Sequence, residues 1–271
     1  MEERSWEGSG LDYTLTRGGR RWSLQLDVDC PGLRAADRPA DQVLTLRALA
    51  AVGRTDLLAL SSRSLVGVER VARRIEARYA PPGWSGLQVL ASWSPTQELD
   101  GIDLEVEAMA TSVGELKAVE VLVSSRLAAP EASTQEPGHI RVHPRDARSA
   151  ALSYDGREPA STLGRLTTTP VPLTLEPTFS QAMASGPPVE CGGRYLELAH
   201  PHDVARRIIE GQMPVASGDL SIRYGLFGYD LEKGVIVRGR LRGLWVPRDM
   251  ADELSLQAFH DFLELPPPLG H

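Results

Sequence analysis

The 271-residue chain contains no asparagine and only two lysines, so 27 of its 29 basic residues are arginine. Without asparagine it has no Asn-x-Ser/Thr acceptor for N-glycosylation. This residue usage is typical of a high-GC bacterial genome and needs no functional demand to explain it.

Cysteine is equally scarce, with Cys30 and Cys191 as the only two. Two thiols form neither a disulfide framework nor a cysteine zinc site. We expect two reduced cysteines near strand ends.

Long apolar runs are also missing, and none approaches the ~20 residues that cross a bilayer. The first residues, MEERSWEGSG, lack the apolar core of a secretory signal. The net charge of −7 and an aromatic content of 6% both make nucleic acid an unlikely partner. These features predict a cytoplasmic protein that binds no membrane.

Catalytic motifs are absent as well. The chain has no Gly-x-Ser-x-Gly, no Walker loop and no Gly-x-Gly-x-x-Gly. No cofactor is therefore predicted, and the sequence favours a protein that is not an enzyme.

The pentapeptide VARRI occurs twice, at Val71–Ile75 and Val204–Ile208, an offset of 133 residues. The same offset places Leu87 on Leu220 and Gly101 on Gly234, and an LTL triplet recurs at 44–46 and 173–175. Because these matches occur in the same order in both halves of the chain, they predict an internal duplication of a single fold unit.

Each copy is predicted to contain strands, one amphipathic helix and an antiparallel hairpin. The helices are expected over 68–79 and 203–211 from apolar residues at helical spacing. The expected strands, taken from alternating apolar residues, are two in an N-terminal hairpin at 11–28, then 86–94 with 101–110, and 219–228 with 234–246.

The predicted fold class is therefore α+β: two tandem copies of an antiparallel-sheet-plus-helix unit, mostly β, with a C-terminal helix over 249–263. A segment without apolar periodicity, 130–138, is the predicted linker. It divides the chain into a first copy, 1–129, and a second, 139–271.

Two charged strand faces are the most informative candidate site. Asp103, Glu105 and Glu107 alternate with apolar residues in one copy, and Arg238, Arg240 and Arg242 do so in the other. Ordinary solvent-facing sides of sheets account for both rows. Alternatively, the acidic row meets the basic row within a chain or between chains, or both rows line a cavity that holds Mg²⁺ and phosphate.

A second candidate is a metal site, which depends on the linker folding back. Its ligands would be His139, His143, His200 and His202, with Asp146 or Asp203. His-Pro dipeptides in exposed turns explain the same residues without a metal.

These observations together predict a non-catalytic binding or assembly protein. It would use the complementary charge rows to hold a protein partner or a second copy of itself. The alternative is a metal-assisted phosphate-processing enzyme, which would need a divalent metal.

Overall fold

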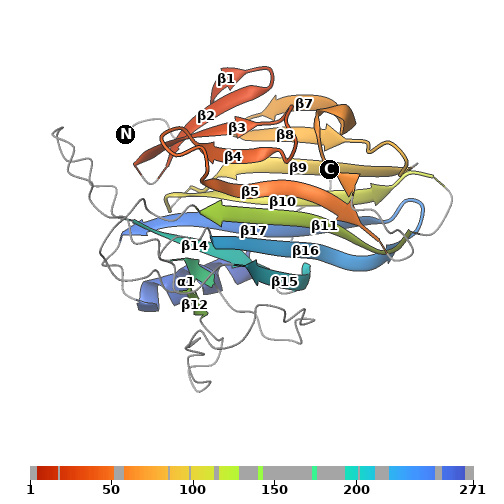
Figure 1. Cartoon of the computed structure of the whole chain (residues 1–271). Helices are drawn as coiled ribbons and strands as arrows, with labels where there is room; N and C mark the ends of the chain where they lie inside the picture. The colour runs from red at the N-terminus through yellow and green to blue at the C-terminus, as the bar shows by residue number, and fades with distance from the viewer. Residues whose placement is uncertain are drawn as a thin grey trace.

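A computed structural model describes twelve segments of the chain, and all structural statements concern them: residues 5–17, 19–51, 58–84, 86–97, 99–112, 116–127, 140–142, 173–175, 193–200, 202–210, 220–247 and 252–265. They form two stacked antiparallel sheets and one C-terminal α-helix (Figure 1).

Sheet A follows the spatial order β1-β2-β3-β4-β5-β11-β16-β15, with β6 paired to β5. Its strands are β1 (Glu7–Ser9), β2 (Asp12–Arg17), β3 (Arg20–Gln25), β4 (Gly32–Ala35), β5 (Gln42–Ala50), β6 (Leu58–Ala59), β11 (Leu116–Leu127), β15 (Val204–Glu210) and β16 (Leu220–Leu231).

Sheet B follows the order β12-β13-β14-β17-β10-β9-β8-β7. Its strands are β7 (Leu65–Val71), β8 (Arg74–Tyr79), β9 (Leu87–Pro95), β10 (Gly101–Ala110), β12 (Ile140–Val142), β13 (Leu173–Leu175), β14 (Gly193–Ala199) and β17 (Ile236–Pro247). A 3₁₀ turn, η1 (Ser62–Ser64), precedes β7, and α1 (Asp252–Glu264) follows β17.

The hydrophobic core lies between the two sheets, because alternate residues of each strand point inward. In β10, Ile102, Leu104 and Val106 are fully buried, while the residues between them are partly exposed. Aromatic rings join the layers, since Trp22 of sheet A lies 4.8 Å from Trp245 of sheet B between ring centroids. One continuous core therefore holds both sheets together.

Several predicted elements are confirmed. β2 and β3 form the N-terminal hairpin, with Tyr13 opposite Leu24 and both buried. β9 and β10 form the second hairpin. The C-terminal helix exists as α1, with Phe259 and Phe262 buried as expected.

The predictions of the two other helices are wrong, and so is the predicted α+β class. Residues 68–79 form the hairpin β7–β8, and 204–210 form the single strand β15. Ile75, Ala77 and Tyr79 are buried alternately, which is a strand period. Their spacing fits both periods over so short a stretch, and β-branched and aromatic residues decide for the strand.

The internal duplication is also wrong. The first VARRI crosses a turn, with Ala72 at φ 52°, whereas the second lies inside one strand. β9 and β10 are neighbours in sheet B, but their supposed equivalents β16 and β17 belong to different sheets. A repeated unit would keep the same pairing, so the recurrence of VARRI is coincidental.

The predicted linker, 130–138, lies outside the described residues. Both sheets contain strands from before and after it, which meet where β16 pairs with β11 in sheet A and where β17 pairs with β10 in sheet B. Among the helical residues that are described, no helix has the length and apolarity to cross a bilayer.

A buried carboxyl group joins the sheets on their inner sides. Glu197 of β14 accepts hydrogen bonds from Ser125 of β11 and from the Tyr195 hydroxyl, the latter at 2.8 Å. The Ser125 hydroxyl also accepts the N–H of Leu44. Burial raises the pKa of Glu197 to about 7, although these hydroxyl donors oppose the rise.

This pKa predicts how stability depends on pH. Because the folded pKa of about 7 exceeds the ordinary 4.5, the folded chain binds the proton more tightly, and its contribution is complete below pH 4.5. As pH rises through 7, the free energy of unfolding falls by about 3 kcal/mol from this group. The check is the free energy of unfolding measured by urea denaturation at acid and neutral pH. In Glu197→Gln it should fall less with pH than in the wild type, because the contribution of Glu197 is missing.

Glu69→Gln is the matched control, since the Glu69 side chain is 59% exposed and should keep the wild-type slope. An unchanged slope in Glu197→Gln would show that Glu197 titrates normally.

Candidate functional site

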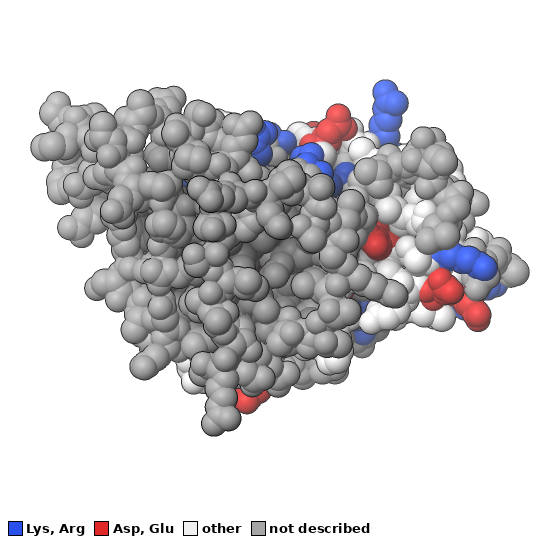
Figure 2. All heavy atoms as spheres, turned by 60° about the horizontal axis from the view of Figure 1, so that its bottom comes forward, with Lys and Arg blue, Asp and Glu red and all other residues white. Residues whose placement is uncertain are grey.

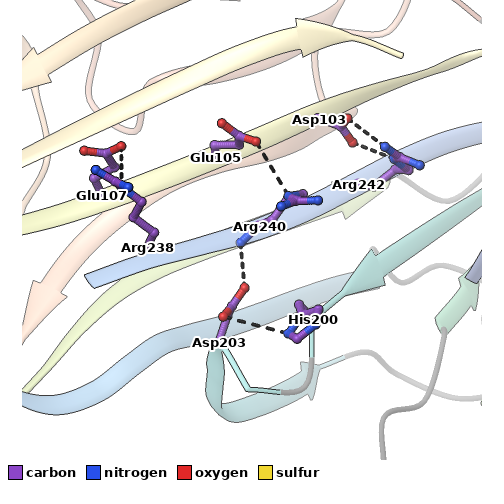
Figure 3. A network of polar contacts seen from close by, with 8 residues as sticks. All are labelled: Asp103, Glu105, Glu107, His200, Asp203, Arg238, Arg240 and Arg242. Atoms are coloured by element: carbon purple, nitrogen blue, oxygen red, sulfur yellow. Dashed lines mark hydrogen bonds and ion pairs between the residues drawn. The ribbon is translucent and has the colours of Figure 1, made fainter. Parts of the chain in front are cut away.

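The two charge rows lie side by side on the outer face of sheet B. Antiparallel pairing of β10 with β17 sets Asp103 opposite Arg242, Glu105 opposite Arg240 and Glu107 opposite Arg238 (Figure 3). The alternating neighbours of these residues fill the core, so the charged side chains must point outward.

Each carboxylate faces a guanidinium, but the three pairs differ. Arg242 donates two hydrogen bonds to Asp103, at 2.6 and 2.8 Å, and Arg238 lies 2.7 Å from Glu107. In the central pair the Arg240 Nε and Glu105 Oε1 atoms are 3.6 Å apart. The central pair therefore has the longest separation of the three.

Glu105 carries a shifted pKa in this pair. Burial raises its pKa above the ordinary value, Arg240 lowers it, and Asp103 raises it again. Arg74 of β8 also lowers the pKa of Glu105, which places the charged side chains of β8 on the same face.

His200 and Asp203 lie beside this central pair, in the turn between β14 and β15. β14 stops pairing with β17 at Ala199, opposite Leu241. The Asp203 carboxylate then accepts the backbone N–H of Arg240, the neighbouring residue of β17, at 3.0 Å. Asp203 thus continues the sheet with a side chain and lies next to the charge rows (Figure 3).

The pKa values of this pair are shifted toward each other. Burial raises the pKa of Asp203 to about 6, against lowering by the Arg240 N–H. Burial lowers the pKa of His200 below 6.5, helped by His202 and Arg240. The raised pKa of Asp203 and the lowered pKa of His200 make an acid and a neutral base available together near pH 6 or below, so the pair can exchange protons with a ligand.

The gap between them is the most informative distance of the site. His200 Nδ1 and Asp203 Oδ1 are 3.9 Å apart, too far for a direct hydrogen bond. The Nδ1 atom is buried and has no hydrogen-bond partner in the described part of the chain. A single oxygen atom between the two groups would satisfy both.

Helix α1 forms a wall of the site. Its Phe259 and Phe262 pack with Leu198 and Leu244 of sheet B. The Phe262 ring centre lies 5.2 Å from the Arg242 guanidinium and 6.5 Å from the His200 ring. Since Phe262 is only 1% exposed, it keeps water from its neighbours and does not face a ligand.

The predicted metal ligands are only partly described. His139, His143 and Asp146 lie outside the described residues. The rings of His200 and His202 are 5.5 Å apart, but the described residues contain no group of three or more His, Cys, Asp or Glu side chains placed to hold a metal ion.

Sequence reasoning missed the contact of Phe262 with His200 and Arg242, and the approach of Asp203 to His200. The first depends on where α1 docks. The second had one signal, the close spacing in His-Pro-His-Asp, which we interpreted either as part of a metal site or as an exposed turn.

Comparison with known proteins finds no matching family model and no significantly similar curated protein. Similar solved structures include a putative aldose 1-epimerase from Escherichia coli K12, with a TM-score of 0.49, 10% identity, and coverage of 87% of this chain and 99% of that one. A galactose mutarotase related enzyme from Lactobacillus acidophilus has a TM-score of 0.49 at 10% identity, over 89% and 99% of the two chains. Another putative aldose 1-epimerase, from Klebsiella pneumoniae, reaches 0.48 at 8%, over 95% and 85%.

The predicted non-catalytic binding or assembly function is corrected, because the acidic and basic rows on which it depended neutralise each other within one sheet. The similar structures carry enzyme names, two putative aldose 1-epimerases and a galactose mutarotase related enzyme. Figure 2 shows both basic and acidic side chains among the described residues on one face of the molecule.

The phosphate-processing alternative fails for the same physical reason. It required Arg238, Arg240 and Arg242 to hold phosphates, but each lies 2.6–3.6 Å from a carboxylate of β10. A phosphate would have to displace those carboxylates.

If the Phe262 ring shields His200 from water, removing the ring should change the pKa of His200. Replacing Phe262 with alanine admits water, so the pKa of His200 should rise back toward 6.5. NMR titration of the imidazole checks this. Phe262→Leu, which keeps an apolar cover, should leave the titration near that of the wild type, and equal titrations in both folded variants would rule out the wall.

Proposed function

We propose that this chain is a sugar-processing enzyme that binds an uncharged aldose on the outer face of sheet B and moves protons with His200 and Asp203. The observation that carries the proposal is the 3.9 Å gap between His200 Nδ1 and Asp203 Oδ1, beside a buried Nδ1 that has no hydrogen bond in the described chain. The two oxygens on C1 of an aldose ring, the hydroxyl and the ring oxygen, can each meet one of the two atoms.

The charge rows support an uncharged, hydroxyl-rich ligand. Three carboxylates face three guanidiniums, so the rows together carry no net charge to attract an anion. Fixed acceptors and donors side by side suit neighbouring hydroxyl groups, which both donate and accept. In the central pair, where Arg240 and Glu105 are 3.6 Å apart, the Glu105 side chain is 32% exposed and can accept a hydrogen bond from a ligand hydroxyl.

The simplest reaction that needs only an acid and a base is the opening and closing of an aldose ring. The base, neutral His200, takes the proton of the C1 hydroxyl, and a carbonyl forms at C1 as the bond to the ring oxygen breaks. The acid, protonated Asp203, gives a proton to that ring oxygen. Closure from the other face of the carbonyl inverts C1, and both groups regain their starting protonation.

The activity depends on both side chains of the pair. Asp203→Asn and His200→Gln should each slow the reaction by about 10²–10⁴-fold, because each removes a proton-transfer group. The test is polarimetry of freshly dissolved neutral hexoses and pentoses, with the uncatalysed rate subtracted. His260→Gln, an exposed histidine on α1, is the matched control and should keep full activity. A wild-type protein that accelerates none of these sugars would overturn the proposal.

The two pKa shifts also predict a bell-shaped pH profile, with its alkaline limb at about pH 6. Asp203 is the acid only while protonated, so kcat/KM should fall as pH rises above about 6. His200 is the base only while neutral, so the rate should also fall once pH drops below its lowered pKa. A rate that continues to increase through pH 8 would show that Asp203 is not the acid.

A further inference from the structure

Asp203 is held on three sides. Its backbone N–H donates to the His200 carbonyl at 3.0 Å, its own carbonyl accepts the Phe227 N–H at 2.7 Å, and its Oδ2 accepts the Arg240 N–H at 3.0 Å. The last two contacts come from different sheets, β16 of sheet A and β17 of sheet B. Only Oδ1 is directed toward His200.

Phe227, which donates the hydrogen bond to the Asp203 carbonyl, has an unusual backbone conformation. Its φ is 80°, in a region that large side chains rarely adopt, and the residue is 3% exposed. Gly228 follows at φ 69°, where an added Cβ would lie 2.7 Å from the Cβ of Ala205. Such conformations persist only where the surrounding contacts impose them, and they cluster at functional sites.

Gly239 provides the space that this arrangement needs. A Cβ at Gly239 would lie 3.0 Å from Cε1 of the Phe227 ring and 3.2 Å from Cβ of Asp203. The ring and the aspartate therefore meet over a backbone without a side chain, one residue before Arg240.

We propose that Phe227 and Gly239 are positioning residues that hold the Asp203 carboxylate at its distance from His200, a role that rests on the function proposed for that pair. Phe227 fixes the main chain of Asp203 from sheet A, and its ring packs over Gly239. The missing side chain at Gly239 lets the carboxylate reach the Arg240 N–H.

Gly239→Ala tests this directly. The new methyl group pushes on Asp203 and lengthens its bond from the Arg240 N–H. Because that hydrogen bond lowers the pKa of Asp203, weakening it should raise that pKa above its present value of about 6. We expect a rise of about 0.5–1 pH unit, measured by ¹³C NMR of the carboxyl carbon in the full chain without any ligand.

Gly67→Ala is the matched control. Gly67 also lies in a strand of sheet B, but a Cβ there meets nothing within 4 Å, so the titration of Asp203 should not change. If Gly239→Ala alone does not fold, the double variant Gly239→Ala/Phe227→Leu takes its place. Leucine makes room on the ring side, while the methyl group still presses on Asp203.

An unchanged Asp203 pKa in the folded Gly239 variant would overturn the positioning role. That result is separate from the sugar assay, since the titration needs no substrate. With an active sugar in hand, the alkaline limb of the pH profile should move upward with the Asp203 pKa, and an unmoved limb would equally count against the role.

Discussion

The pairing of β10 with β17 determines most of what is distinctive about this protein. Each strand alone presents a row of like charges at alternate positions, which repel one another. Side by side and antiparallel, the rows become three ion pairs, of which Asp103 with Arg242 is the closest. The same pairing buries the intervening apolar residues of β10 in the core, so sheet B has one charged side and one apolar side.

The end of β14 creates the candidate site as a consequence of that arrangement. Where β14 separates from β17, the Asp203 side chain accepts the backbone N–H of Arg240. The residue that completes the sheet is thus also the residue with a raised pKa next to His200. Helix α1 then keeps water away from His200, Arg240 and Arg242 through Phe262.

The inner and outer sides of β14 carry different ionisable groups. Glu197 points into the sandwich, where hydroxyl groups of Ser125 and Tyr195 hold it. Three residues later, His200 belongs to the outer face. Neutral hydroxyls suit a core position because they donate hydrogen bonds without burying a second charge. Charged partners suit the outer face because the carboxylates there remain partly in water.

The sequence by itself determined which residues alternate. Period-two burial was correctly predicted for the hairpins β2–β3 and β9–β10, for the individual strands β16 and β17, and for the charge rows on β10 and β17. Local periodicity suffices there because the pleat of a single strand sets the direction of its side chains. Over 68–79 the spacing fits a helix and a strand equally well; β-branched and aromatic residues favour the strand, and β8 pairs with β9 in the sheet. Which strands become neighbours, which row faces which, and how Asp203 meets His200, Phe227 and Gly239 were decided by tertiary structure, because these contacts join residues that no local pattern relates.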